Sequence, residues 1–154
     1  KPFNHMTILP DGSGQITGLV AEVGFASELI QQSISFSWVG SEKGPYDFVC
    51  DMKGTEVKID VKCKKRNVPP TPFYSAHVTE DQRNYDCNIY VFASLTDENL
   101  SFMGWYPKPH YWRDATLVKK GDPDGRGYTE RADAGKMEYG DLKPMKSLFE
   151  TYLK

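Results

Sequence analysis

The pattern of apolar and polar positions along the chain predicts that its first regular element is a helix. Between Thr17 and Gln32, apolar side chains recur at the spacing of one helix face, and Thr17 can serve as the N-cap. The stripe expected to face the core consists of Leu19, Val23, Ala26 and Ile30. Glu22 lies at the margin of this stripe, so the helix brings a carboxylate close to the surface that it covers.

Strands are predicted next, because the apolar pattern changes from helical spacing to alternation. Ile34–Val39 is expected to form a short strand, and Tyr46–Met52 and Thr55–Lys64 a hairpin joined at Lys53-Gly54. One face of the second hairpin strand is apolar, with Val57, Ile59, Val61 and Cys63. The opposite face is polar, with Lys58, Asp60, Lys62 and Lys64.

The strand expected at the centre of the sheet is Cys87–Leu95, because its sequence is apolar on both faces. Before it, Asn67–Tyr74 carries three prolines and is expected to be a loop, and Thr79–Gln82 has the capping-box spacing that opens a helix. The later elements expected are a strand at 100–106, a helical turn at 107–115, a flexible loop at 121–136, a strand at 137–142 and a helix at 144–152.

A single domain over residues 1–154, with residues 1–16 as a lead-in loop, accommodates these elements. The chain is 39% hydrophobic and 26% charged, as expected for a domain with a packed core. A helix, three strands, a second helix and further strands predict an α/β fold in which a central mixed β-sheet is flanked by helices.

The cysteine content and the net charge limit the cellular compartments and the binding partners expected for this protein. The three cysteines are an odd number without a CxxC pair, which argues against a disulfide framework and a structural zinc site and favours the cytoplasm, or the host cytoplasm for a phage protein. No stretch approaches the about 18 apolar residues of a membrane span, and the start of the chain lacks a signal pattern, so no membrane partner is expected. The net charge of −2 excludes a polycation that binds nucleic acid indiscriminately.

The candidate chemistry follows from the register of the hairpin. If Lys53-Gly54 is a two-residue turn, Met52 faces Thr55, and Asp47 then faces Asp60. Lys62 projects from the same face as Asp60, two residues further on. Two opposed carboxylates repel each other unless a positive charge lies between them, and a divalent cation supplies that charge.

Oxygen ligands suit Mg²⁺, with Mn²⁺ as a substitute. Asp47, Asp60 and the backbone carbonyl of Val61 could hold such an ion, and Glu22 could bind it directly or through water. The arrangement suits phosphodiester hydrolysis, in which the cation polarises the phosphoryl oxygen and lowers the pKa of bound water. Lys62 could orient that water or stabilise the charge of the transition state.

These residues resemble the PD-(D/E)xK, or restriction-endonuclease-like, nuclease superfamily, and in particular its small phage-type members. The superfamily places a Glu on the first helix, an Asp on the second strand and a (D/E)xK triplet on the third strand. Glu22, Asp47 and Asp60-Val61-Lys62 occur here in that order, although Pro45-Tyr46-Asp47 departs from the adjacent Pro-Asp of the pattern. The resemblance covers about residues 17–95 and extends to the predicted strand with Gly104-Trp105.

The resemblance implies a Mg²⁺- or Mn²⁺-dependent deoxyribonuclease that acts on DNA, with Glu22, Asp47, Asp60 and Lys62 as its catalytic residues. It also implies that Gln82 lies near the metal site, as in some members of the superfamily. Lys64 extends from the same strand and could contact phosphate. An endonuclease and an exonuclease both fit, and a homodimer is left open.

Less specific interpretations stay open. The polar hairpin face could be a solvated surface, Glu28 or Asp51 could replace the assigned acids, and Gln82 could only complete the capping box. Exposed aromatic side chains could stack on bases, and the candidates are Tyr74, Tyr85, Trp105, Tyr106, Tyr111 and Trp112. The alternative function is a non-catalytic nucleic-acid-binding or phage accessory protein on a nuclease-like fold.

Overall fold

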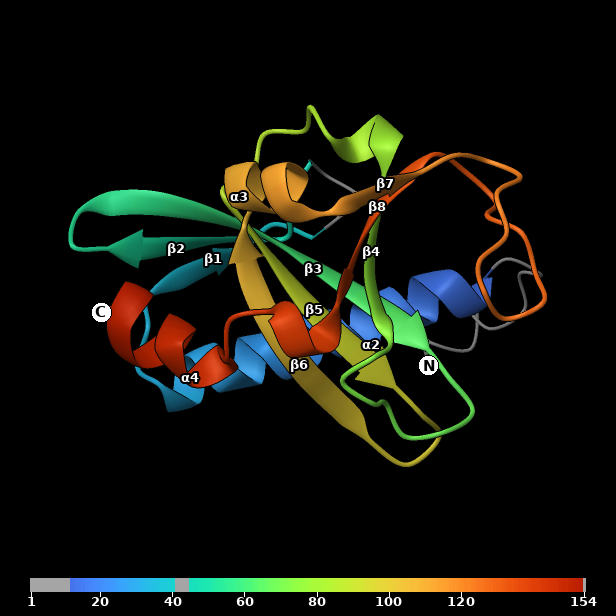
Figure 1. Ribbon diagram of the computed structural model, residues 1–154. Helices are drawn as coiled ribbons and strands as arrows, with labels where there is room; N and C mark the ends of the chain where they lie inside the picture. The colour runs from blue at the N-terminus through green and yellow to red at the C-terminus, as the bar shows by residue number, and fades with distance from the viewer. Residues whose placement is uncertain (1–11, 41–44, 154) are drawn as a thin grey trace.

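Two β-sheets and the helices that cover them make up the protein (Figure 1), whose computed structural model describes residues 12–40 and 45–153. The larger sheet has the order β1-β2-β3-β5-β6. Its strands are β1 (Phe36–Trp38), β2 (Phe48–Met52), β3 (Thr55–Lys65), β5 (Ile89–Leu95) and β6 (Leu100–Pro107). Because β3 and β5 run parallel and the other pairs antiparallel, the sheet is mixed, as predicted.

The β2–β3 hairpin has the predicted register. Met52 pairs with Thr55, and both turn residues have positive φ, 50° for Lys53 and 85° for Gly54. These dihedrals define the type I′ turn that matches the twist of antiparallel strands. The Oδ1 atom of Asp51 accepts a hydrogen bond from the Gly54 N–H (3.1 Å), which holds the Asp51 side chain at the turn.

One face of the large sheet is covered by helix α2 (Gly12–Gln31) and the C-terminal helical segment (Figure 1). The helix begins at Gly12, so the expected lead-in loop is wrong for residues 12–16, and Thr17 lies within the helix rather than at its start. The expected stripe is confirmed for Ala26, which is buried, but wrong for Val23 and Ile30, which are exposed. The fully buried residues of the helix are Ala21, Phe25 and Leu29. The apolar residues of this segment surround the helix, and the large Phe25 ring faces the sheet.

The other face of the large sheet is covered by helix α3 (Lys108–Asp114) and a three-stranded sheet. This second sheet has the order β4-β8-β7, with β4 (Ser75–Thr79), β7 (Thr116–Val118) and β8 (Ala134–Glu138). The sequence did not predict β4 or β7, so the expectation of one sheet is incomplete. Strand β5 lies between the two cores and is buried almost throughout, as expected for a central strand.

Several expected boundaries change in the second half of the chain. Residues 134–136, assigned to the flexible loop, belong to β8, and β8 gives way to the 3-10 helix η2 (Tyr139–Asp141). The predicted last helix consists of α4 (Met145–Ser147) and a π-helical turn, η3 (Leu148–Tyr152). Among the helices of the described residues, none combines the length and the apolar character needed to cross a membrane.

Candidate active site

The two predicted aspartates meet at the end of the β2–β3 pairing. Phe48–Ile59 is the last pair of the register, the Asp47 N–H donates to the Ile59 carbonyl (2.9 Å), and Asp47 and Asp60 are the next residues beyond that pair. Both residues are buried, with exposed fractions of 1% for Asp47 and 7% for Asp60. Asp47 Oδ2 accepts a hydrogen bond from the Val61 N–H (2.8 Å), but no hydrogen-bond partner of Asp47 Oδ1 is present among the described residues.

The electrostatic state of Asp47 reflects this position. Burial first, and then the negative charges of Asp60 and Glu22, together raise the pKa of Asp47 from 3.8 to about 8, against the lowering effect of the Val61 N–H. Desolvation and like charges both disfavour the ionised carboxylate. With both aspartates ionised, the site would hold more negative charge than its described surroundings compensate, and Asp47 therefore retains its proton to a higher pH.

The ammonium group of Lys62 is held between two side chains. Lys62 Nζ lies 2.9 Å from Asp60 Oδ2 and also donates to Gln82 Oε1. Gln82 ends the short 3-10 helix η1 (Glu80–Gln82), in which Thr79 makes no side-chain capping bond. The capping-box prediction is therefore wrong, and Gln82 contacts the expected active-site lysine instead.

Glu22 reaches the same region from helix α2. Its side chain is 6% exposed, and its charge is among those that raise the pKa of Asp47, whereas that of Glu28 is not. Glu22 Oε1 accepts a hydrogen bond from the indole N–H of Trp38 (2.9 Å), at the end of β1. The Trp38 ring also stacks on Phe48, with 5.7 Å between the centroids. The sequence did not reveal Trp38 as a partner of Glu22, because no local pattern relates a helix to this edge strand.

No protein-family model matches the chain, and no curated protein sequence matches it either. Among solved structures, the Holliday junction resolvase Hjc of Archaeoglobus fulgidus is similar, with 14% identity, a TM-score of 0.50, and coverage of 89% of this chain and 98% of that chain. A bacterial homing endonuclease, I-Ssp6803I, shows 18% identity, a TM-score of 0.49, and coverage of 76% of this chain and 88% of that chain.

This chain has the restriction-endonuclease-like fold. The likeness confirms the fold class predicted from the sequence, a central mixed sheet flanked by helices. At this level of identity, the arguments for the site rest on the side chains of the chain itself.

The remaining candidates lie at different distances from the two aspartates. Lys64 is exposed on the polar face of β3 and contributes to the electrostatic surroundings of His77 on β4. Asp51 is held at the hairpin turn and does not contribute to the cluster. Within residues 12–40 and 45–153, no three carboxylate, imidazole or thiol groups form a ready-made metal-binding group.

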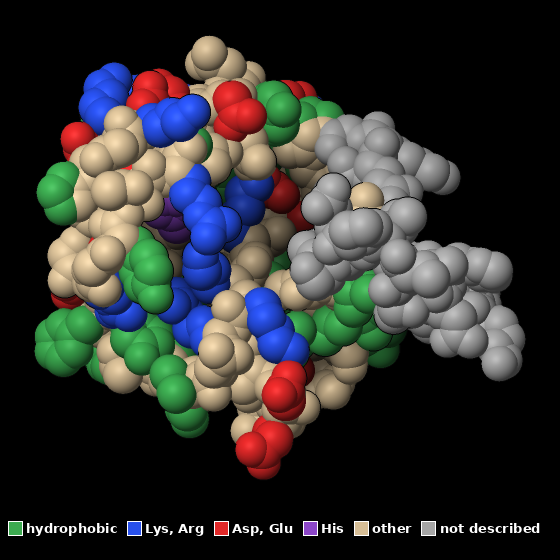
Figure 2. Space-filling model, turned by 90° about the vertical axis from the view of Figure 1, so that its right-hand side faces the viewer, with side chains coloured by type: hydrophobic (Ala, Val, Ile, Leu, Met, Phe, Trp, Pro, Cys, Tyr) green, Lys and Arg blue, Asp and Glu red, His purple; other side chains and the backbone are tan. Residues whose placement is uncertain are grey.

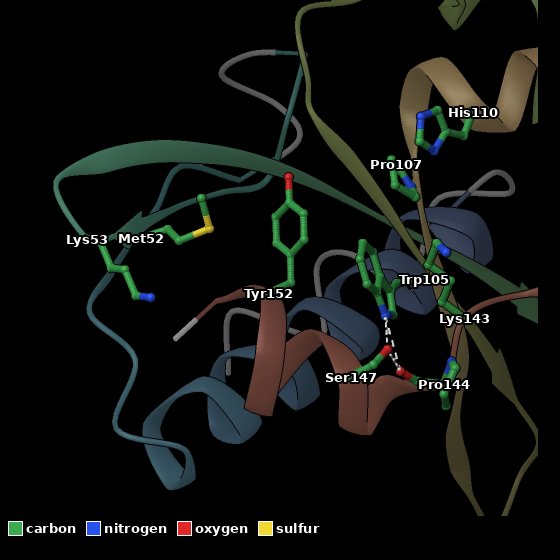
Figure 3. A pocket seen from close by; sticks show the side chains of 9 residues that line it. All are labelled: Met52, Lys53, Trp105, Pro107, His110, Lys143, Pro144, Ser147 and Tyr152. Atoms are coloured by element: carbon green, nitrogen blue, oxygen red, sulfur yellow. Dashed lines mark hydrogen bonds between the residues drawn. The ribbon is translucent and has the colours of Figure 1, made fainter.

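A cavity of about 680 Å³ lies elsewhere, between the hairpin tip and the C-terminal helical segment (Figure 3). Its lining is Met52, Lys53, Trp105, Pro107, His110, Lys143, Pro144, Ser147 and Tyr152. The indole N–H of Trp105 donates to Ser147 Oγ (2.9 Å) and the Pro144 carbonyl (3.1 Å), so this wall ties β6 to the last helix. The lining includes none of the predicted site residues, and the cavity is separate from the carboxylate site.

Proposed function

We propose that the protein is a divalent-cation-dependent nuclease that hydrolyses DNA phosphodiester bonds, with Mg²⁺ or Mn²⁺ held at Asp47 and Asp60. The observation that carries the proposal is the buried pair of opposed aspartates, one with a raised pKa and a carboxylate oxygen that has no hydrogen-bond partner among the described residues. A cation between these carboxylates would replace the missing partner and remove their repulsion. The fold of the Holliday junction resolvase is compatible with this function.

The donor set fits a hard cation. Asp47 and Asp60 supply carboxylate oxygens, and Glu22 could complete the set directly or through water. Residues in a β-strand direct their N–H and C=O to the same edge. Because the Val61 N–H points to Asp47 Oδ2, the Val61 carbonyl also points to this edge, beyond Phe48, where β2 begins. A bound cation would supply Lewis acidity and a water molecule of lowered pKa.

The other residues would position the reacting groups. Lys62 carries its positive charge beside Asp60 and can donate a hydrogen bond to the attacking water or to a phosphoryl oxygen. Gln82 would fix the direction of the Lys62 ammonium group. Trp38 would hold one oxygen of Glu22, which limits the rotamers of that carboxylate.

The test is cleavage of labelled linear, circular, single-stranded and branched DNA with Mg²⁺, with Mn²⁺ or with EDTA. Asp60→Asn and Lys62→Met should remove the metal-dependent products and leave the far-ultraviolet circular dichroism spectrum unchanged. Asp51→Asn is the matched control, because it alters an acid of the same hairpin that is engaged at the turn. Its cleavage rate should equal that of the wild type.

Two results would refute the proposal. Full cleavage by Asp60→Asn would show that the products come from another site or another protein. DNA binding without any cleavage by the wild type, in either metal, would favour a non-catalytic nucleic-acid-binding protein on the same fold.

A further inference from the structure

A cationic row leads away from the carboxylates along β3. Asp60, Lys62 and Lys64 alternate on one face of the strand, and Arg66 follows at the same spacing. Neighbours on one face of a strand are about 6.6 Å apart, twice the rise per residue. Figure 2 shows the side of the molecule at which β3 ends, where Lys and Arg side chains gather in a column beside a hollow.

Two guanidinium groups contact one tyrosine ring at the end of this row. The guanidinium carbons of Arg66 and Arg126 each lie 4.5 Å from the centroid of the Tyr74 ring. Arg66 also donates to the Tyr139 hydroxyl (3.1 Å) and to the Ser75 carbonyl (3.4 Å), which fixes it on the small-sheet side. Arg126 comes from the loop between β7 and β8, so this contact joins two loops that are far apart in sequence.

Beyond Lys62, which is paired with Asp60, the cations at this end of the row have no acidic partner among the described residues. In the part of the chain that the structure describes, no carboxylate lies within 4.0 Å of a charged nitrogen of Lys64, Arg66 or Arg126. Asp124 is near Arg126, but its Oδ1 accepts hydrogen bonds from the backbone N–H groups of Arg126 (2.8 Å) and Tyr128 (3.1 Å) and so closes the loop. Clustered cations without acids favour an anionic ligand.

Large aromatic rings are exposed on the two segments that carry Tyr74 and Arg126. Phe73, next to Tyr74, is 72% exposed, and Tyr128, two residues after Arg126, is 77% exposed. Neither ring is engaged in the hydrophobic cores. Exposed rings next to guanidinium groups are the combination that binds unpaired nucleic-acid strands, with bases stacked on the rings and phosphates on the cations.

We propose that this surface, called the platform, binds an unpaired DNA strand that extends from the carboxylate site. The platform consists of Lys64, Arg66, Phe73, Tyr74, Arg126 and Tyr128. The role of the platform as part of a nuclease rests on the proposed function, although its binding of DNA does not. A duplex offers phosphates but hides its base faces within its own stack, so the exposed rings favour a substrate with a single-stranded segment, such as a flap, a gap or a branch.

The binding test uses fluorescence anisotropy in EDTA, which separates binding from cleavage. The probes are a labelled oligothymidylate and a blunt duplex of equal length, with Phe73→Ala, Tyr128→Ala and Arg126→Ala. We expect the wild type to prefer the oligothymidylate, and each ring variant to bind it about 5- to 100-fold more weakly with little change for the duplex. Arg126→Ala should weaken both and lower the slope of log affinity against log salt by about one.

The controls are exposed residues outside the platform. Leu117→Ala removes an exposed apolar side chain from β7, and Lys146→Ala removes a cation from α4, on the opposite side of the large sheet. Both should bind like the wild type. Equal affinity for the two probes, or ring variants that bind oligothymidylate like the wild type, would overturn the platform.

The binding test and the cleavage test fail independently. The Asp60→Asn variant should still prefer oligothymidylate to the duplex, because Asp60 lies outside the platform. If that preference holds but no DNA is cleaved in Mg²⁺ or Mn²⁺, the platform stands and the nuclease proposal is wrong. If cleavage depends on Asp60 but the protein does not prefer oligothymidylate to the duplex, the nuclease proposal is supported and the platform proposal is wrong.

Discussion

Asp47 and Asp60 lie next to each other directly beyond the Phe48–Ile59 pair that ends the β2–β3 pairing, and both are almost fully buried. Their burial costs free energy, because two carboxylates share a poorly solvated site in which, among the described residues, the ammonium group of Lys62 alone lies at ion-pair distance from Asp60. Proteins keep such an arrangement at functional sites, where a strained electrostatic state serves binding or chemistry. The cost can be measured in the metal-free protein.

The stability of the metal-free protein should fall as the pH rises from about 4 to about 8, because the raised pKa of Asp47 makes the folded state hold a proton that the unfolded chain has released. For one group, the slope is at most about 1.4 kcal/mol per pH unit. Asp47→Asn should flatten this dependence, because the amide has no proton to lose and still accepts from the Val61 N–H. Urea denaturation in EDTA at several pH values measures the free energy of unfolding.

The control for this experiment is Asp51→Asn, which replaces an exposed carboxylate of the same hairpin and should keep the wild-type slope. Identical slopes for the wild type and Asp47→Asn would contradict the assigned protonation of Asp47.

Gln82 should act on catalysis through Lys62. Removal of the Oε1 acceptor in Gln82→Ala leaves the Lys62 ammonium group with Asp60 as its remaining partner in the described site. We expect kcat to fall about 10-fold or more with little change in KM for DNA, since the contact orients a reacting group rather than the substrate. Single-turnover cleavage with saturating Mg²⁺ measures this effect.

Gln82→Glu retains an acceptor and should restore part of the lost rate, whereas Asn84→Ala, an exposed neighbour, should leave it unchanged. A rise in KM with normal kcat in Gln82→Ala would assign Gln82 to substrate binding instead.

Loss of the Trp38 indole N–H should raise the Mg²⁺ concentration that cleavage requires. Trp38→Phe keeps an aromatic ring beside Phe48 but removes the indole N–H that binds Glu22 Oε1. Residues that orient metal ligands change metal affinity about 10- to 100-fold when lost. The Mg²⁺ concentration for half-maximal cleavage should rise accordingly, and the rate at saturating Mg²⁺ should recover.

Phe36→Leu is the comparison, because Phe36 also contacts the Phe48 ring (5.8 Å between centroids) and makes no hydrogen bond to Glu22. An equal rise in both variants would attribute the effect to packing around Phe48 rather than to Glu22.

The hairpin and its two aspartates could be predicted because local chemistry determines them. Lys53-Gly54 adopts the positive φ values of a type I′ turn, and this turn sets the register, which runs to the Phe48–Ile59 pair and leaves Asp47 and Asp60 as the next residues. The central strand was predictable for a similar reason, since only a strand covered on both faces is apolar throughout. In each case the deciding residues lie close together in the sequence.

The features that the sequence did not reveal depend on distant contacts. Phe25 rather than Val23 faces the sheet, and a helix that is apolar on several sides gives no indication of that choice. Strand β4 pairs with β8, which follows much later in the chain. The contact of Arg126 with Tyr74 likewise joins two loops that have no shared local pattern.

Gly104 should be essential for the packing of β6 against the segment that leads to the last helix. Its φ is +153°, and a Cβ at this position would lie 2.6 Å from Leu142 Cβ and 2.7 Å from the Lys143 carbonyl oxygen. Those atoms cannot withdraw easily, because Trp105 and Lys143 are joined by two backbone hydrogen bonds, each 3.0 Å long. Gly104→Ala should therefore lower the free energy of unfolding by about 1–3 kcal/mol, as overpacking does in other proteins.

Gly18→Ala gives the matched comparison for that measurement. A Cβ at Gly18 meets no atom within 4 Å, and the residue lies inside helix α2, so the substitution should stabilise the protein by about 1 kcal/mol. Opposite signs for the two glycines in urea denaturation would separate the steric cost at Gly104 from the general entropic effect of replacing glycine. A neutral Gly104→Ala would mean that Leu142 and Lys143 can move away from β6, and the wall that Trp105 forms with the last helix would then be adaptable rather than fixed.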